Sequence, residues 1–256
     1  KNANTGLGYQ TLNANTTGAG NTSIGYQTLF SNIDGGSNTG VGHKTLYSNT
    51  VGYDNTAVGN GALYANTTGI ENTATGYGAL VSNTTGNKNS ATGNSALYNN
   101  TTGSENTANG YQSLFSNTIG SYNVANGNQS LYSNTIGVRN VANGIESLYY
   151  NTTGNNNVAM GGYALNSITT GSNNIAIGAY AGEYIGNNSY GNIFLGTNAK
   201  ATTNNTNLTN ATAIGNKATV SQDNSIILGA VNGINGFSGE TKVGIGVTAP
   251  LTFLDV

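Results

Sequence analysis

The sequence predicts an all-β protein built as a parallel β-solenoid. Three observations predict this fold class: a constant internal period, glycine at fixed places in that period, and a near absence of charge. The 256 residues include 39 Gly and one Pro, with no Cys or Trp, and only 6% are charged. Because only 36% are hydrophobic, the chain has too little apolar material for one broad core, and we expect repetition to order it.

The 17-residue period is marked by anchor glycines, our name for the glycines that recur once per period from Gly8 and Gly25 to Gly178. Asn stands four residues before every anchor glycine. Leu stands four residues after all of them but the last, and a second Gly stands ten residues after the same ones. If each period forms one coil, equivalent residues stack on the next coil at the inter-strand spacing of about 4.8 Å.

Each coil is predicted to hold two short strands joined by turns. The string N-T-A-x-G, as at 55–59, alternates faces, so the residues one and three before the anchor glycine share one side. The second strand is predicted around the Leu. Turns are expected at the N-T-T-G stretch, where Asn and Gly adopt left-handed backbone at little cost, and the same residues disfavour a helix.

The repeat pattern divides the chain into three parts. Residues 1–180 carry the regular 17-residue repeats, and residues 181–232 carry irregular ones with glycines at Gly196, Gly215 and Gly229. Residues 233–256 hold Pro250 and leave the pattern, so we expect a transition segment towards a stalk or C-terminal domain. Since the chain starts at Lys1 without an initiator Met, we expect a segment of a longer protein.

The predicted coil is too thin to be stable alone. A 17-residue coil encloses little more than one Ala and one Leu, so apolar residues directly before the anchor glycines, such as Ile24, Val41 and Val58, would be exposed. An exposed apolar row of this kind indicates an association surface. We therefore expect several coiled chains side by side.

The middle of that row is polar and forms the first candidate site. It consists of Thr75, Thr92, Asn109, Asn126 and Asn143. One interpretation is a buried structural ladder in which stacked hydroxyl and amide groups satisfy one another. The other is a site for water or an anion.

The second candidate site is an aromatic row, which lies five residues after the anchor glycines. Its members are Tyr47, Tyr64, Tyr98, Phe115, Tyr132 and Tyr149, with Phe30 before them and Val81 interrupting. The rings could form a packing ladder, coil upon coil. They could also form a contact stripe for carbohydrate or another surface, because tyrosine offers rigid amphipathic area.

Several function classes are disfavoured by the composition. His43 is the only His, and no acid falls in a repeat-borne cluster, so we expect no catalytic residues, no metal site and no cofactor. We interpret His43 as a solvent-facing substitution in a row of tyrosines. Scattered Lys and Arg and a net charge of −2 argue against nucleic acid. The sequence has no run of 18 apolar residues, so we expect no membrane span.

Two strings near the end of the repeats resemble a known family. Residues 210–218 and 223–229 are similar to the head repeats of YadA-like trimeric autotransporter adhesins, and the spacing of Gly215 and Gly229 matches the repeat of that family. Strings such as 55–69 are similar to longer repeats of bacterial surface proteins and phage tail-fibre proteins, and 242–256 resembles the segment before a stalk or chaperone domain. The resemblance implies a left-handed β-roll and a homotrimer.

We therefore expect a structural and adhesive fibre segment, the non-catalytic shaft or head of a trimeric surface adhesin or phage tail fibre. Its partner would be a host-surface glycan, a protein receptor or another surface. The alternative is a solenoid that binds a repetitive surface, either polysaccharide or ice. Glycans on the repeated Asn-x-Thr sequons would crowd at about 4.8 Å, which favours a bacterial or viral origin and an extracellular location, on the bacterial surface or the virion.

Overall fold

The computed structural model describes residues 3–202, 207–230, 243–244 and 254–255. The chain divides into two compact units, Lys1–Arg139 and Asn140–Val256. All regular structure in the described residues is β, and these residues contain no helix long and apolar enough to cross a bilayer. Each unit is a parallel β-solenoid, as the sequence predicts.

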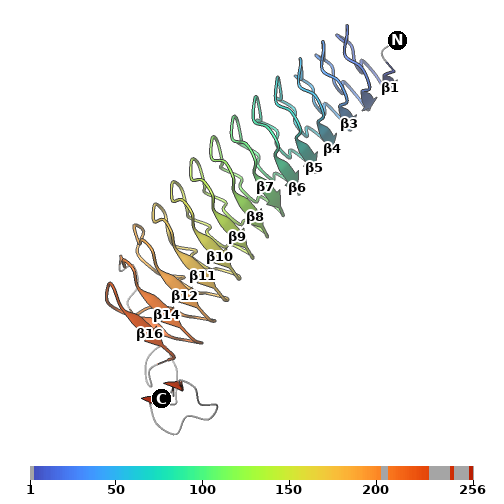
Figure 1. Cartoon of the computed structure of the whole chain (residues 1–256). Helices are drawn as coiled ribbons and strands as arrows, with labels where there is room; N and C mark the ends of the chain where they lie inside the picture. The colour runs from blue at the N-terminus through green and yellow to red at the C-terminus, as the bar shows by residue number, and fades with distance from the viewer. Residues whose placement is uncertain (1–2, 203–206, 231–242, 245–253, 256) are drawn as a thin grey trace. The chain divides into compact units, whose positions relative to one another are not determined.

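In Lys1–Arg139, every coil contributes one short strand to a single parallel sheet (Figure 1). Each strand pairs in register with the equivalent strand one period away, as Ala57 pairs with Ala74. The strands are β1 (Thr5–Leu7), β2 (Thr22–Ile24), β3 (Thr39–Val41), β4 (Thr56–Val58), β5 (Thr73–Thr75), β6 (Ser90–Thr92), β7 (Thr107–Asn109) and β8 (Val124–Asn126).

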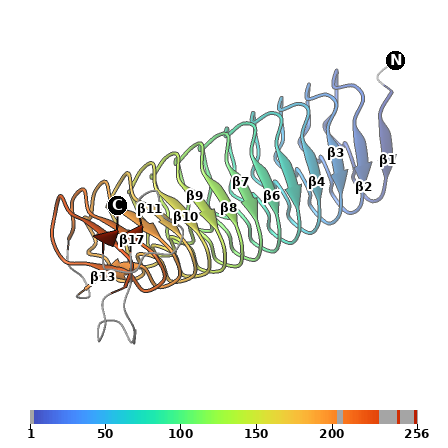
Figure 2. The same cartoon turned by 60° about the horizontal axis from the view of Figure 1, so that its bottom comes forward.

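Asn140–Val256 repeats the arrangement, with its main strands lining one side of the coils (Figure 2). These are β9 (Val141–Asn143), β10 (Val158–Met160), β11 (Ile175–Ile177), β12 (Ile193–Leu195), β14 (Thr212–Ile214) and β16 (Ile226–Leu228). Two further parallel pairs join β13 (Lys200–Ala201) to β15 (Thr219–Val220), and β17 (Val243–Gly244) to β18 (Leu254–Asp255).

The predicted second strand around the Leu is wrong for the regular coils. Leu46 and Leu63 both have φ 51°, and the residue two positions earlier is also left-handed, as Lys44 shows with φ 51°. Left-handed residues at alternate positions turn the chain, whereas a strand needs negative φ throughout. Among the coils that the structure describes, a second strand occurs in the irregular repeats alone, where β13 and β15 follow Gly196 and Gly215.

The predicted three-part division, which rests on the repeat pattern, stays a prediction. The regular coils occur in both compact units, and the boundary at Arg139 falls inside them. The added strands β13 and β15 lie within the predicted irregular part, 181–232. Of the predicted transition segment 233–256, only the short strands β17 and β18 belong to the described residues, and Pro250 lies outside them.

The interior of each coil contains two apolar columns. One is the residue at the centre of each strand, which is Ala from β4 to β11, and the other is the Leu after the anchor glycine; Ala74 and Leu80 are both fully buried. Left-handed backbone at the Leu costs roughly 1–2 kcal/mol, which its complete burial offsets. The core is therefore as narrow as the sequence predicts.

Two columns of buried Asn form ladders that complete the core. In the first, the backbone N–H of Asn72 donates to Asn55 Oδ1 at 3.0 Å and Asn89 N–H donates to Asn72 Oδ1 at 3.0 Å. In the second, Asn83 Nδ2 donates to Asn66 Oδ1 at 2.8 Å. These amides are inaccessible to solvent, so each ladder replaces water as the hydrogen-bond partner.

The two ladders meet at the second Gly of each period. The Gly86 carbonyl accepts from Asn72 Nδ2 at 2.8 Å and from Asn83 Nδ2 at 3.0 Å. A Cβ on Gly86 would overlap the Gly103 carbonyl oxygen and the Asn83 amide. The repeated glycine is thus required by the close approach of the coils.

Replacing one ladder amide should destabilise the protein strongly. In Asn72→Ala, the Asn89 N–H loses its acceptor and the Gly86 carbonyl loses one donor, so we expect a loss of about 2–3 kcal/mol in the free energy of unfolding. The exposed Asn60 supplies the matched control, and Asn60→Ala should change this free energy by less than about 0.5 kcal/mol. Denaturant unfolding followed by circular dichroism measures both. Equal effects would contradict the ladder's role.

Candidate contact surface

The aromatic row forms a stacked column on the surface. Phe30 and Tyr47 have ring centroids 5.1 Å apart, and Tyr47 and Tyr64 are 5.2 Å apart, with planes within 5° of parallel. A second run continues from Tyr98 through Phe115 to Tyr132, again with 5.2 Å steps. Each ring is half-buried, so ring faces pack on one another while ring edges reach solvent.

The backbone positions these rings. Each follows directly after a buried Leu, so Leu46 points into the coil while Tyr47 lies on the outside. Coil-to-coil hydrogen bonds, such as Ser48 N–H to the Tyr64 carbonyl at 3.0 Å, fix the distance between successive rings. The row is a packing ladder as predicted. Because Tyr98 and Tyr132 are only half-buried, the contact interpretation also stays a prediction.

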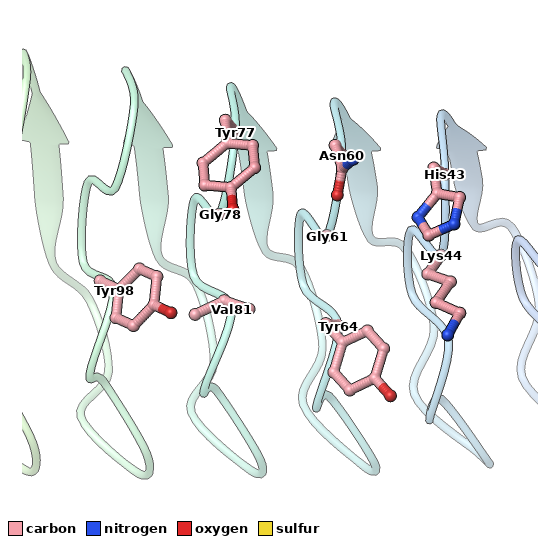
Figure 3. A pocket seen from close by; sticks show the side chains of 9 residues that line it. All are labelled: His43, Lys44, Asn60, Gly61, Tyr64, Tyr77, Gly78, Val81 and Tyr98. Atoms are coloured by element: carbon pink, nitrogen blue, oxygen red, sulfur yellow. The ribbon is translucent and has the colours of Figure 1, made fainter.

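The row is interrupted at Val81, and a depression of about 190 Å³ lies there. Figure 3 shows Val81 between the rings of Tyr64 and Tyr98, with Gly78 and the Tyr77 ring above it and Gly61 on the neighbouring coil above Tyr64. His43, Lys44, Asn60 and Tyr77 complete the lining. The depression lies wholly within Lys1–Arg139.

His43 belongs to a separate, more exposed row directly after the anchor glycines. It stacks on Tyr26 with centroids 5.2 Å apart, and Tyr26 stacks on Tyr9 at 5.5 Å. His43 is exposed, which confirms the interpretation of it as a solvent-facing substitution.

The polar row is not buried within the chain. Thr75, Thr92 and Asn109 are exposed, and Asn126 and Asn143 are half-buried. Asn109 Nδ2 donates to Asn126 Oδ1 at 2.8 Å, so neighbouring amides do pair. The row lies on the outward strand face, where the sequence places it. Burial between chains stays a prediction, as does binding of water or an anion.

Charges near the rings are few. Lys44 Nζ lies 5.6 Å from the Tyr47 ring centroid, a cation–π distance. In Asn140–Val256, the Glu146 carboxylate raises the pKa of half-buried Tyr163, and a hydrogen bond with Glu183 raises the pKa of Tyr184.

The described residues contain no group of three or more His, Asp or Glu side chains placed to hold a metal ion. The surface around the aromatic row presents ring faces, amides, hydroxyls and an ammonium. These groups can bind a ligand through stacking and hydrogen bonds.

Two features escaped the sequence reasoning. The Asn columns were recognised as a repeat mark but not as buried ladders, because hydrogen-bond partners from successive periods become neighbours only when the coils stack. The depression at Val81 was also missed. Its signal was present: Gly61 and Gly78 replace the Gln, Lys or Ser that most coils of Lys1–Arg139 carry two residues after the anchor glycine.

No protein-family model matches the chain, and the comparison with curated proteins gives no match. Function is therefore argued from the geometry of the chain.

Stacking within the aromatic row should contribute measurably to stability. Phe115 has a ring on each side, so Phe115→Ala should lower the free energy of unfolding by about 2–3 kcal/mol through lost burial and two lost ring contacts. Tyr111, which is 47% exposed and has Asn94 and Asn128 as row neighbours, is the matched control. Tyr111→Ala should cost less than about 1 kcal/mol. Thermal unfolding of both variants measures the difference, and a smaller effect for Phe115→Ala would refute the ladder.

Proposed function

We propose that the chain is a structural and adhesive fibre segment, non-catalytic and homotrimeric, that attaches its bearer to a surface outside the cell. Shafts and heads of trimeric surface adhesins and phage tail fibres, which the repeats resemble, are the settings in which such a segment works. The observation that carries the proposal is the exposed apolar row on the strand face of in-register coils.

That row is unusual for a chain with so little apolar material. Leu7 is 67% exposed, and Ile24, Val58, Met160 and Ile177 are between 37% and 44% exposed. Each points away from the buried centre of its own coil. Apolar side chains occupy this row from β1 to β4 and again from β10 onwards, with the polar row Thr75 to Asn143 between them. Each apolar stretch provides an association surface, which supports burial against sister chains.

Repetition also supports a mechanical role. Each coil is bonded to its neighbours along β strands, turns and Asn ladders, so a unit resists bending at every step. Stiff spacing and repeated presentation of the same side chains are what an attachment fibre requires, and the exposed ring edges supply contact area.

One observation favours the alternative, a solenoid that binds a repetitive surface. Hydroxyl side chains three residues before the anchor glycine form a registered row from Thr5 to Thr107 across β1 to β7. The hydroxyl row ends where Val124 replaces Thr, which limits the length of a repetitive surface that it could match. Ice recrystallisation in the presence of the chain tests this function directly.

Association through the strand face predicts that charge on it separates the chains. Ile24→Lys combined with Val58→Lys should convert a trimer to monomers at micromolar concentration, because three chains would bring like charges together in an apolar contact. Ile119→Lys is the control, since Ile119 is 54% exposed but lies outside the strand face. Light scattering of each variant gives the mass. A monomeric parent chain would overturn the trimer.

Attachment predicts that the chain alone confers adhesion. Beads coated with the chain should resist washing from plates coated with cell-wall polysaccharide or serum glycoprotein more than beads coated with albumin do. The measurement is the fraction of beads retained at increasing shear. Retention no better than albumin on either plate would leave a spacer role only and overturn the adhesive part of the proposal.

A further inference from the structure

We propose that the depression at Val81 is a subsite for one hexopyranose ring of a surface polysaccharide. The inference rests on the proposed attachment function and names the ligand class of one place on the contact surface. The sugar ring would take the position of the aromatic ring that the row lacks.

The space between the Tyr64 and Tyr98 rings matches the thickness of one ring missing from the aromatic row. Stacked neighbours in the row are 5.1–5.2 Å apart, and Tyr64 and Tyr98 are separated by two coils, about 10 Å along the stack. A ring placed over Val81 therefore meets a tyrosine face on each side. A pyranose ring is puckered and carries C–H groups on both faces, so it is thicker than a planar ring and suits this spacing.

The depression is open because several side chains are small at once. Gly61 and Gly78 have φ 67° and 61°, close to the left-handed backbone of Gln27 in the equivalent position, so glycine is not needed there for conformation. Gln27 instead covers the surface and donates to Gln10 at 2.8 Å. A Cβ on Gly78 would lie 3.1 Å from Tyr98 Cε2, so a side chain at residue 78 would push against the Tyr98 ring that borders the depression.

The rim matches a sugar better than an aromatic side chain. Lys44, Asn60, Tyr77 and His43 place an ammonium, an amide, a hydroxyl and an imidazole around the opening (Figure 3). Hydroxyls project from the edge of a pyranose in all directions and can pair with these groups, whereas an aromatic edge offers them almost nothing. At about 190 Å³ the depression is smaller than the roughly 300–1,000 Å³ of sites for larger ligands, which suits a single ring.

Titration of the chain, residues 1–256, with defined tetrasaccharides tests the proposal. The probes are β-1,4-glucan, β-1,4-linked N-acetylglucosamine and α-1,4-galacturonan, with the Kd measured by calorimetry and ring contacts measured by saturation-transfer NMR. We expect at least one probe to bind with saturation transfer from Tyr64 and Tyr98. Val81→Tyr, which completes the stack, and Gly61→Gln, which restores the side chain of other coils, should each raise the Kd at least about tenfold.

The variants separate loss of the site from loss of the fold. Val81→Tyr and Gly61→Gln should melt no lower than the parent, since both introduce residues that neighbouring coils accommodate. Tyr53→Ala is the control, because Tyr53 is an exposed tyrosine outside the lining, and it should leave the Kd unchanged.

Three results would overturn the subsite. An unchanged Kd in Val81→Tyr would place the saccharide elsewhere, and absence of binding by all three probes would exclude hexopyranose. Binding of a tryptophan-containing peptide in the gap without any saccharide would assign the site to a protein partner. In each case, retention of coated beads under shear decides separately whether the attachment function stands.

Discussion

The buried Asn ladders are the interaction on which the rest of the structure depends. Each coil has an interior too narrow for water, yet its backbone must turn several times, and every turn leaves peptide groups inside. Each ladder amide accepts from the next coil and donates to a glycine carbonyl, as Asn72 does with Asn89 and Gly86. Unsatisfied, these groups would each cost about 1–3 kcal/mol, so every coil must bring a hydrogen-bonding group back to the ladder. The longer coils do so too, since the Asn192 N–H donates to Asn174 Oδ1 and the Ala211 N–H donates to Asn192 Oδ1.

The same constraint explains the composition. Coils that approach closely enough to share these hydrogen bonds leave no space for a Cβ at Gly86 or at the anchor glycines, such as Gly76 with φ 129°. The interior then holds only small Ala and a single Leu. Apolar residues beyond that capacity lie outside, and this is the physical basis of the proposed association with sister chains.

Register converts sequence variation into surface chemistry. Equivalent residues of successive coils stack at a fixed spacing. A run of similar residues therefore forms a stripe on the surface, and one smaller residue within the run leaves a depression. Tyr47 and Tyr64 form part of such a stripe, and the smaller Val81 leaves the depression. The backbone hydrogen bonds that hold the period do not involve these outer side chains, so the surface chemistry can change along one face while the coils keep their register.

The sequence by itself determined the period, the parallel coil-on-coil register, the buried Ala and Leu columns and the position of the aromatic row, because each is a direct consequence of spacing. Backbone conformation and the direction of side chains do not follow from spacing and depend on how the coils pack. Left-handed backbone at Leu46 replaced the predicted second strand, and the two Asn columns turned inwards to hydrogen-bond between coils. The depression at Val81 likewise depends on side chains from four coils, which become neighbours only when the chain is wound.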